Sequence, residues 1–301
     1  MHDITQGTPQ GTSQGISHDI ARDPSPDVSA TTRADELTRR LTQDRYPHSN
    51  RYDVRWIIEN QMGPHPLWLL EWLAPALGLD TLAPGSRVLD LGCGRALTSV
   101  FLAREYDVQV TAADLWIKPD DNWQRIKQAG CADRVLPLHV EAHDLPFAEG
   151  CFDAIVCIDA YHYFGTDNMY LPTLTRLLRP GGRIGVVVPV FLEEPDGPGW
   201  PEGPDGDEPP EHLRPAWSSD LWTLHSPQWW RRHWARSGTV DVEAADLQAD
   251  GWRDWLLWCE VCAEESDDEF TVTQGRRWSK ILRADAGRTF GFARLVGRRR
   301  N

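Results

Sequence analysis

The sequence is poor in cysteine and methionine, and it contains no long apolar run. Its 301 residues include six cysteines and three methionines. Six cysteines are too few for a disulfide scaffold, so we expect a protein of a reducing cytoplasm. No apolar stretch approaches the roughly 18 residues that a membrane-spanning helix needs. The N-terminus has no basic region followed by an apolar stretch, so no secretory signal is expected.

Positive charge is also scarce. Lys and Arg total 31 against 45 Asp and Glu, which gives a formal net charge of −14. Such an acidic surface repels phosphate backbones and disfavours a nucleic-acid partner. Hydrophobic residues make up 41% of the chain, a normal share for a globular protein, which excludes a wholly disordered chain. Nothing in the sequence indicates an oligomeric state.

The chain divides by composition into three parts. Residues 1–34 are rich in small polar residues and proline without any apolar period, and we expect a disordered tail. Residues 35–84 contain helical patterns and predict a helical N-terminal cover. Residues 85–301 are expected to form the main domain.

Strand and helix patterns alternate through this main domain. Strands are predicted at 87–91, 108–113, 135–140, 152–158, 183–190, 239–245 and 289–296, with helices in the intervals. This alternation is typical of an α/β fold with a mostly parallel sheet and helices on both faces. Residues 193–235 interrupt this alternation. The part up to residue 215 contains seven prolines and eight acidic residues, and a tryptophan-rich stretch follows, so we expect a lid or insert before the sixth strand.

The first predicted strand ends in a glycine turn, Asp90-Leu91-Gly92-Cys93-Gly94. Glycines let the backbone approach a ligand, and the following helix N-terminus offers free N–H groups. Asp114, at the end of the next strand, can accept hydrogen bonds from ribose hydroxyls. A dinucleotide site would need a third glycine where this chain has Ala96, and a carboxylate at Asp90 is a poor neighbour for a pyrophosphate.

These residues resemble the class I S-adenosylmethionine-dependent methyltransferases, whose first motif is matched by Asp90, Gly92 and Gly94. The resemblance implies a seven-stranded Rossmann-like sheet and S-adenosyl-L-methionine as cofactor. It places Asp114, Leu115 and Trp116 beside the ribose and adenine, and Glu141 and Ala142 at the adenine edge, with Glu141 standing where the family usually has Asp. Cys93 and Ile158 are further candidate cofactor contacts. Asp144 is a rival for that role. The nearest branch includes cyclopropane-fatty-acid-synthase-like and ubiquinone-type methyltransferases.

The loop after the fourth strand, from Ile158 to Phe164, should face the reacting methyl group, because ligands sit beyond the carboxyl ends of the strands. His162 is a candidate general base, and Asp159 is a candidate partner for a cationic substrate or a cap of the following turn. Candidate substrate contacts are Tyr52, Gln61, Tyr163, Trp222 and Trp230.

No metal site is expected. His139, His143 and Asp144 match no metal template, and the pair Cys259 and Cys262 has no second pair nearby.

The sequence therefore predicts methyl transfer to a small-molecule acceptor at N, O or C, in specialised metabolism. Three alternatives stay open: C-methylation of a lipid or isoprenoid, a nicotinamide-dependent oxidoreductase, and a module that binds the cofactor without turnover.

Overall fold

The computed structural model describes residues 28–195, 197, 200–203 and 206–300 and groups the chain into two units, residues 1–40 and 41–301. Helix α1 (Val28–Leu41) begins within the segment that we expected to be a disordered tail. Arg39 and Arg40 in its last turn complement the helix dipole. Residues 1–27 of the predicted tail lie outside the described residues.

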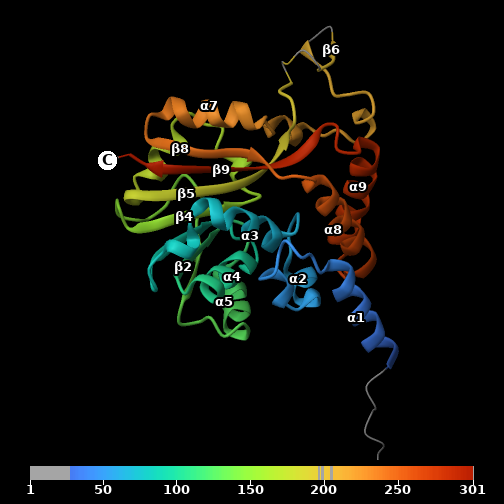
Figure 1. Ribbon diagram of the computed structural model, residues 1–301, viewed down its shortest axis with the longest axis horizontal. Helices are drawn as coiled ribbons and strands as arrows, with labels where there is room; N and C mark the ends of the chain where they lie inside the picture. The colour runs from blue at the N-terminus through green and yellow to red at the C-terminus, as the bar shows by residue number, and fades with distance from the viewer. Residues whose placement is uncertain (1–27, 196, 198–199, 204–205, 301) are drawn as a thin grey trace, which may run out of the picture. The chain divides into compact units, whose positions relative to one another are not determined.

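The second unit is built on a seven-stranded sheet in the order β3-β2-β1-β4-β5-β9-β8 (Figure 1). All neighbouring pairs are parallel except those of β9, which runs antiparallel to β5 and β8. The predicted mostly parallel α/β sheet is therefore confirmed. Its strands are β1 (Arg87–Leu91), β2 (Gln109–Asp114), β3 (Val135–His139), β4 (Phe152–Ile158), β5 (Leu178–Phe191), β8 (Val240–Leu247) and β9 (Phe290–Arg299).

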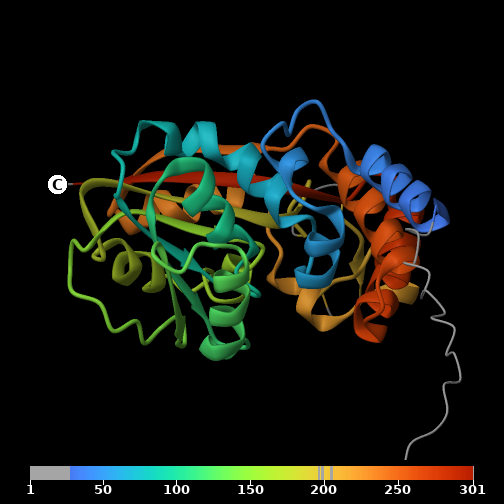
Figure 2. The same ribbon diagram turned by 90° about the horizontal axis from the view of Figure 1, so that it is seen from below.

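Helices cover both faces of this sheet (Figure 2). They are α2 (Val54–Asn60), α3 (Pro66–Leu77), α4 (Leu97–Tyr106), α5 (Pro119–Gln128), α6 (Tyr170–Thr175), α7 (Pro227–Ser237), α8 (Gly251–Glu265) and α9 (Glu269–Asp285). Short 3₁₀ helices are η1 (Ser49–Arg51), η2 (Leu79–Thr81), η3 (Tyr161–Tyr163), η4 (Arg214–Ala216) and η5 (Ser219–Thr223).

The alternation of side chains along the strands separates the two faces. Ile184, Val186 and Val188 of β5 belong to a buried cluster that includes residues of α6 and α7. Gly185, one position out of phase, lies on the other face, where an added Cβ would be 2.9 Å from Leu77 of α3. Because β-strand side chains alternate, most positions of the inner strands β1, β4, β5 and β9 are buried on one face or the other, while the edge strands β3 and β8 are largely exposed or half-buried.

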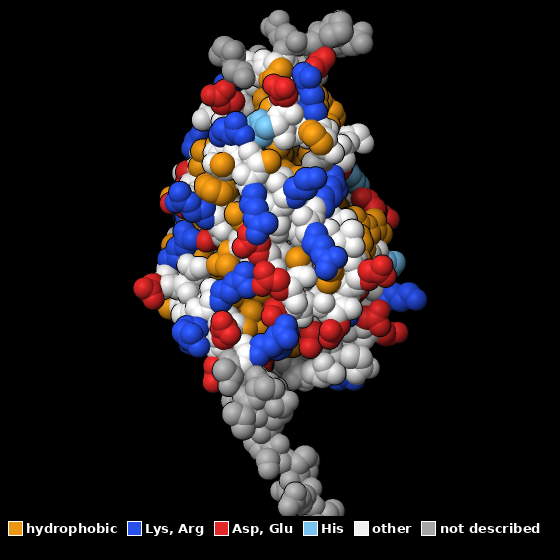
Figure 3. Space-filling model, turned by 90° about the vertical axis from the view of Figure 1, so that its right-hand side faces the viewer, with side chains coloured by type: hydrophobic (Ala, Val, Ile, Leu, Met, Phe, Trp, Pro, Cys, Tyr) orange, Lys and Arg blue, Asp and Glu red, His pale blue; other side chains and the backbone are white. Residues whose placement is uncertain are grey.

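In the sequence, helices α8 and α9 lie between strands β8 and β9, and the two helices pack against each other as an antiparallel pair. They approach closely because Gly275 has no side chain: a Cβ there would lie 2.7 Å from the carbonyl oxygen of Cys259. The Asp268 carboxylate caps α9 by accepting a hydrogen bond from the Thr271 amide. On the face of the molecule toward α8 and α9, basic and acidic side chains are interspersed (Figure 3).

The predicted insert contains the short strands β6 (Glu202–Gly203) and β7 (Gly206–Asp207), followed by η4 and η5. One histidine–carboxylate contact ties the insert to the rest of the unit, since His212 lies 3.0 Å from Asp285 at the end of α9. A second contact lies within the insert, where His225 is 2.5 Å from Glu194. Among the described helices, none is long and apolar enough to cross a membrane.

Candidate active site

The glycine loop after β1 adopts backbone conformations that favour glycine. Gly92 and Gly94 have φ angles of 71° and 53°. A Cβ on Gly92 would lie 2.5 Å from the Cβ of Ala160, so this position has no room for a side chain. Ala96, where the resembling family often has glycine, also has a left-handed φ of 62°. The loop therefore keeps the backbone shape of a three-glycine turn with alanine in the last place.

Asp90 is completely buried beneath this loop. Its Oδ2 accepts hydrogen bonds of 2.6 Å from the hydroxyls of Thr98 and Ser99, at the start of α4. Burial raises the pKa of Asp90 to about 6. Its Oδ1 has no described hydrogen-bond partner. Asp90 thus anchors α4 to β1 from below and does not line the cavity above the loop.

Asp114 closes the other side of the loop. Its Oδ2 accepts a hydrogen bond of 2.8 Å from the Gly94 amide, and its Oδ1 accepts from the amides of Trp116 and Ile117. Oδ1 uses both of its acceptor sites on these two amides, whereas Oδ2 accepts one hydrogen bond and keeps a second acceptor site free. Asp114 therefore fixes the loop and still presents an acceptor to the cavity.

A cavity of about 330 Å³ opens above the loop. Nine of the ten predicted cofactor residues line it, Asp90 being the exception: Gly92, Cys93, Gly94, Asp114, Leu115, Trp116, Glu141, Ala142 and Ile158. The Cys93 thiol is buried, which raises its pKa well above the usual range, so this side chain is a neutral filler.

Glu141 lies on the outer wall of this cavity and is exposed. Its carboxylate accepts hydrogen bonds of 2.8 Å from both the backbone amide and the ring Nδ1 of His143. The hydrogen bond from the His143 ring is the main reason that the pKa of Glu141 is lowered. Asp144, the rival, does not line either cavity described here.

A second cavity of about 480 Å³ adjoins the first. The two share Met62, Gly63, Pro64, Arg95, Trp116, Asp159 and Tyr163. Its far wall comes from α8 and α9, with Trp255, Trp258 and Trp278 among its lining residues. The arrangement provides one compartment at the glycine loop and a second, aromatic one beside it.

Asp159 and His162 both reach the second cavity. Asp159 follows β4 with a φ of 57° and lines both cavities. Burial raises its pKa to about 8. His162 is 4% exposed, and burial lowers its pKa to about 3, so the imidazole is neutral at ordinary pH. Its Nδ1 has no described partner.

Three of the five predicted substrate contacts lie outside both cavities. Trp230 is fully buried in the core, with its ring centroid 5.7 Å from that of Tyr161. Tyr52 is buried, and its hydroxyl donates a hydrogen bond of 2.9 Å to Glu105. Trp222 packs on Trp217 at 4.9 Å, outside the lining of either cavity. Packing buries the rings of Trp230 and Tyr52, which gives these two residues structural roles, whereas Trp222 is 39% exposed and its substrate contact stays a prediction.

The other two predicted contacts do line the second cavity. Gln61 is buried and its Nε2 donates to the Thr271 hydroxyl at 3.1 Å, which joins the N-terminal segment to α9. Tyr163 is 54% exposed, and its ring lies 6.0 Å from Trp116 at the junction of the two cavities.

The sequence analysis missed the contribution of α8 and α9. The helical spacing of Trp255, Trp258 and Cys262 signals a buried face, and that face is both core and cavity wall. It also missed Asn122, whose side chain donates a hydrogen bond of 2.9 Å to the Gly94 carbonyl. No motif distinguishes such residues from ordinary packing. Within the described part of the chain, no group of three His, Cys, Asp or Glu side chains could hold a metal ion.

Comparison with known proteins agrees with this geometry. Residues 88–182 match the family described as a methyltransferase domain. A curated relative, 27-O-demethylrifamycin SV methyltransferase of Amycolatopsis mediterranei (strain S699), is 29% identical over 121 residues, which span 40% of this chain and 44% of the relative. The chain thus spans less than half the length of this relative.

Solved structures share the fold. One titled as a putative sarcosine dimethylglycine methyltransferase from Galdieria sulphuraria superposes with a TM-score of 0.61 at 18% identity, covering 84% of this chain and 98% of that one. A [4+2]-cyclase superposes at 0.52 with 18% identity, covering 76% of this chain and 80% of that one. Residues 88–182 thus carry a methyltransferase domain, which agrees with the resemblance to the class I S-adenosylmethionine-dependent methyltransferases.

Proposed function

We propose that the protein binds S-adenosyl-L-methionine in the first cavity and transfers its methyl group to a small molecule in the second. The observation that carries this proposal is the shared boundary of the two cavities at Gly63, Asp159 and Tyr163. S-adenosylmethionine, when bound, would supply a sulfonium methyl group that an acceptor nucleophile attacks, with S-adenosylhomocysteine as the leaving group. The cyclase among the structural relatives shows that this fold alone does not fix the reaction, so the second cavity matters.

The residues of the first cavity fit this cofactor. The loop at Gly92 and Gly94 admits a close backbone approach, and Asp114 presents an acceptor for ribose hydroxyls. Leu115 and Trp116, both exposed at the cavity, offer apolar surface for the adenine. Glu141 lies on the same wall and can accept from the exocyclic amine of the base.

The chain's own contribution to the chemistry is orientation and exclusion of water. Holding two reactants in line can supply roughly 7–11 kcal/mol of a barrier. Gly63 and Tyr163 line the junction through which the acceptor must approach. We also propose a cytoplasmic protein without a nucleic-acid partner, in line with the net charge of −14 and the free state of all six cysteines.

The test is calorimetric titration with S-adenosylhomocysteine, with a nicotinamide dinucleotide in parallel. Wild-type protein should bind the former at micromolar concentration and not the latter. Asp114→Asn should weaken binding by about 10- to 100-fold, because a charged acceptor contributes about 1.5–3 kcal/mol. Asp144→Asn, an exposed carboxylate outside the cavities, is the matched control and should bind like wild type. Binding of the dinucleotide alone would refute the proposal.

A further inference from the structure

We propose that the acceptor is an amine carried on an apolar or aromatic body, and that the Asp159 carboxylate binds its nitrogen and removes its proton. This inference rests on the proposed methyl transfer and names the substrate class of the same site.

The first observation is the position of Asp159. It stands at the end of β4, where the two cavities meet. A Cβ on Gly63 would lie 2.4 Å from Asp159 Oδ2, so the missing side chain of Gly63 makes room for this carboxylate. The left-handed φ of 57° is a strained conformation for a residue other than glycine. Strain of this kind persists where the surrounding structure holds a residue in place, as it does at functional sites.

The second observation is that the chain does not offset the burial of this carboxylate. Burial is the one cause of its raised pKa, and no described hydrogen-bond donor or cation counters it. Asp159 is half-buried. A carboxylate that is partly withdrawn from water without a partner is costly, since paired or hydrogen-bonded neighbours normally accompany such charges. A bound ammonium group would supply both the charge and the N–H donors that are missing.

The other charged groups of the second cavity are already engaged or exposed. Arg277 donates to the Ser218 hydroxyl at 2.8 Å, and Arg95 donates to the Glu59 carbonyl at 2.9 Å. Asp268 caps α9. The titratable and charged groups that line this cavity with Asp159 are Arg95, His162, Tyr163, Asp220, Cys259, Cys262, Asp268 and Arg277.

The third observation is the apolar wall opposite the acid. Trp255, Trp258 and Trp278 line the cavity with the buried Leu221 and Leu224. Aromatic faces bury apolar rings and also attract cations. This wall suits the body of the acceptor, while Asp159 suits its nitrogen.

His162 is the less suitable base. The imidazole is almost completely buried, and its pKa is lowered to about 3, so it binds a proton weakly. Asp159, with a pKa raised to about 8, is a much stronger base and accepts a proton from an ammonium group more readily. An ordinary alkylammonium group has a pKa of about 10, so its pKa lies only about 2 above that of Asp159.

For a primary amine, the ammonium group first gives one proton to Asp159 and becomes a neutral amine. Its nitrogen lone pair forms the new bond to the methyl carbon as the bond between sulfur and that carbon breaks, and the electron pair stays on sulfur. The product is an N-methylammonium ion and S-adenosylhomocysteine, and Asp159 releases its proton to water.

The experiment uses matched pairs of probes with the full chain saturated with S-adenosylhomocysteine. Phenethylamine is compared with 2-phenylethanol, and tryptamine with tryptophol, by calorimetric titration. We expect each amine to bind at least tenfold more tightly than its alcohol. The amine affinity should rise as the pH approaches about 8, where Asp159 ionises, and fall above about 10, where the amine loses its charge. With S-adenosylmethionine, mass spectrometry should then detect the N-methylated amine.

Asp159→Asn should remove the preference for amines and the methylated product while S-adenosylhomocysteine still binds. Asp144→Asn should retain both. Equal binding of amine and alcohol, binding of neither, or an unchanged preference in Asp159→Asn would overturn the inference and leave the proposed function standing. Failure of the wild-type protein to bind S-adenosylhomocysteine would instead refute the proposed function itself.

Discussion

At the scale of single residues, left-handed backbone occurs at three informative positions that are not glycine. Ala96 ends the glycine loop, Asp159 stands between the cavities, and Ala286 follows α9. This conformation costs roughly 1–2 kcal/mol for a residue with a Cβ. Ala96 belongs to the glycine loop below the first cavity, and Asp159 lines both cavities, so the backbone strain at these two residues coincides with the candidate active site. At Ala286 it serves only to end a helix, where the amide bonds back to the Leu282 carbonyl at 2.8 Å.

Ala286→Gly should therefore stabilise the protein by about 1 kcal/mol, because Ala286 is exposed and its methyl group buries no surface. Urea unfolding followed by circular dichroism measures the change in the free energy of unfolding. Ala284→Gly, two residues earlier and still helical, is the matched control and should destabilise by about 1 kcal/mol. A loss of stability in both variants would show that backbone strain at Ala286 is not relieved.

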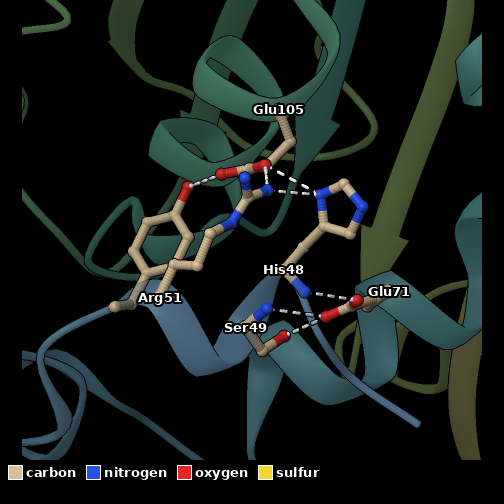
Figure 4. A network of polar contacts seen from close by, with 6 residues as sticks. His48, Ser49, Arg51, Glu71 and Glu105 are labelled. Atoms are coloured by element: carbon tan, nitrogen blue, oxygen red, sulfur yellow. Dashed lines mark hydrogen bonds and ion pairs between the residues drawn. The ribbon is translucent and has the colours of Figure 1, made fainter. Parts of the chain in front are cut away.

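At the scale of elements, the buried Glu71 and the half-buried Glu105 hold the segment that leads to the cavities. Glu71 of α3 accepts hydrogen bonds from the amides of His48 and Ser49, at 2.8 Å and 2.7 Å, and from the Ser49 hydroxyl (Figure 4). Glu105 of α4 contacts His48 and Arg51 and accepts from the Tyr52 hydroxyl. The turn η1 is thus fixed to both helices. The chain then continues to Met62 and Gly63 at the cavity junction.

Glu71→Gln should destabilise the protein by about 2–3 kcal/mol. Glutamine presents one acceptor oxygen instead of two charged ones, so at least one buried amide loses its partner. The change should appear as a lower midpoint in urea with an unchanged slope. Glu59→Gln, an exposed residue of α2, should leave the midpoint within about 0.5 kcal/mol of wild type. A silent Glu71→Gln would show that water replaces these bonds.

At the scale of the whole molecule, the two cavities are assembled from segments far apart in the chain. The first uses the carboxyl ends of β1, β2, β3 and β4, which meet at one edge because the strands are parallel. Residues 62–64, which precede the sheet, line both cavities, and the second adds residues from 255 to 278, which lie between β8 and β9 in the sequence. A ligand in the second cavity therefore contacts both early and late parts of the fold.

Ligand binding should accordingly stabilise the whole unit. Saturation with S-adenosylhomocysteine at 100 times its dissociation constant adds about 2.7 kcal/mol. For a domain of this size, that corresponds to a rise of about 5–10 °C in melting temperature. Differential scanning calorimetry measures the shift, with a nicotinamide dinucleotide as the negative control. A shift with the dinucleotide and none with S-adenosylhomocysteine would contradict the assigned cavity.

Local signals predicted the parts of the fold and site that depend on neighbours in sequence. The strand ending in Asp90, the glycines at 92 and 94, and the acid at 114 could be placed because turn chemistry and strand period act over a few residues. The prediction did not include the start of α1 at Val28, because residues 28–34 have only a weak helical pattern and the stronger pattern begins at Asp35. Trp230 and Tyr52 were misplaced because a sequence does not show whether an aromatic ring faces a cavity or the core.

The sequence by itself determined the sheet, the family and the position of the glycine loop, because each follows from short-range pattern and spacing. Only the tertiary structure decided what surrounds the acceptor cavity. Helices α8 and α9 were expected from their periodicity, but their approach to Asp159 and Gly63 depends on long-range packing across the ends of the strands. The burial of Asp159, and hence its raised pKa, is likewise a property of that assembly and of no local motif.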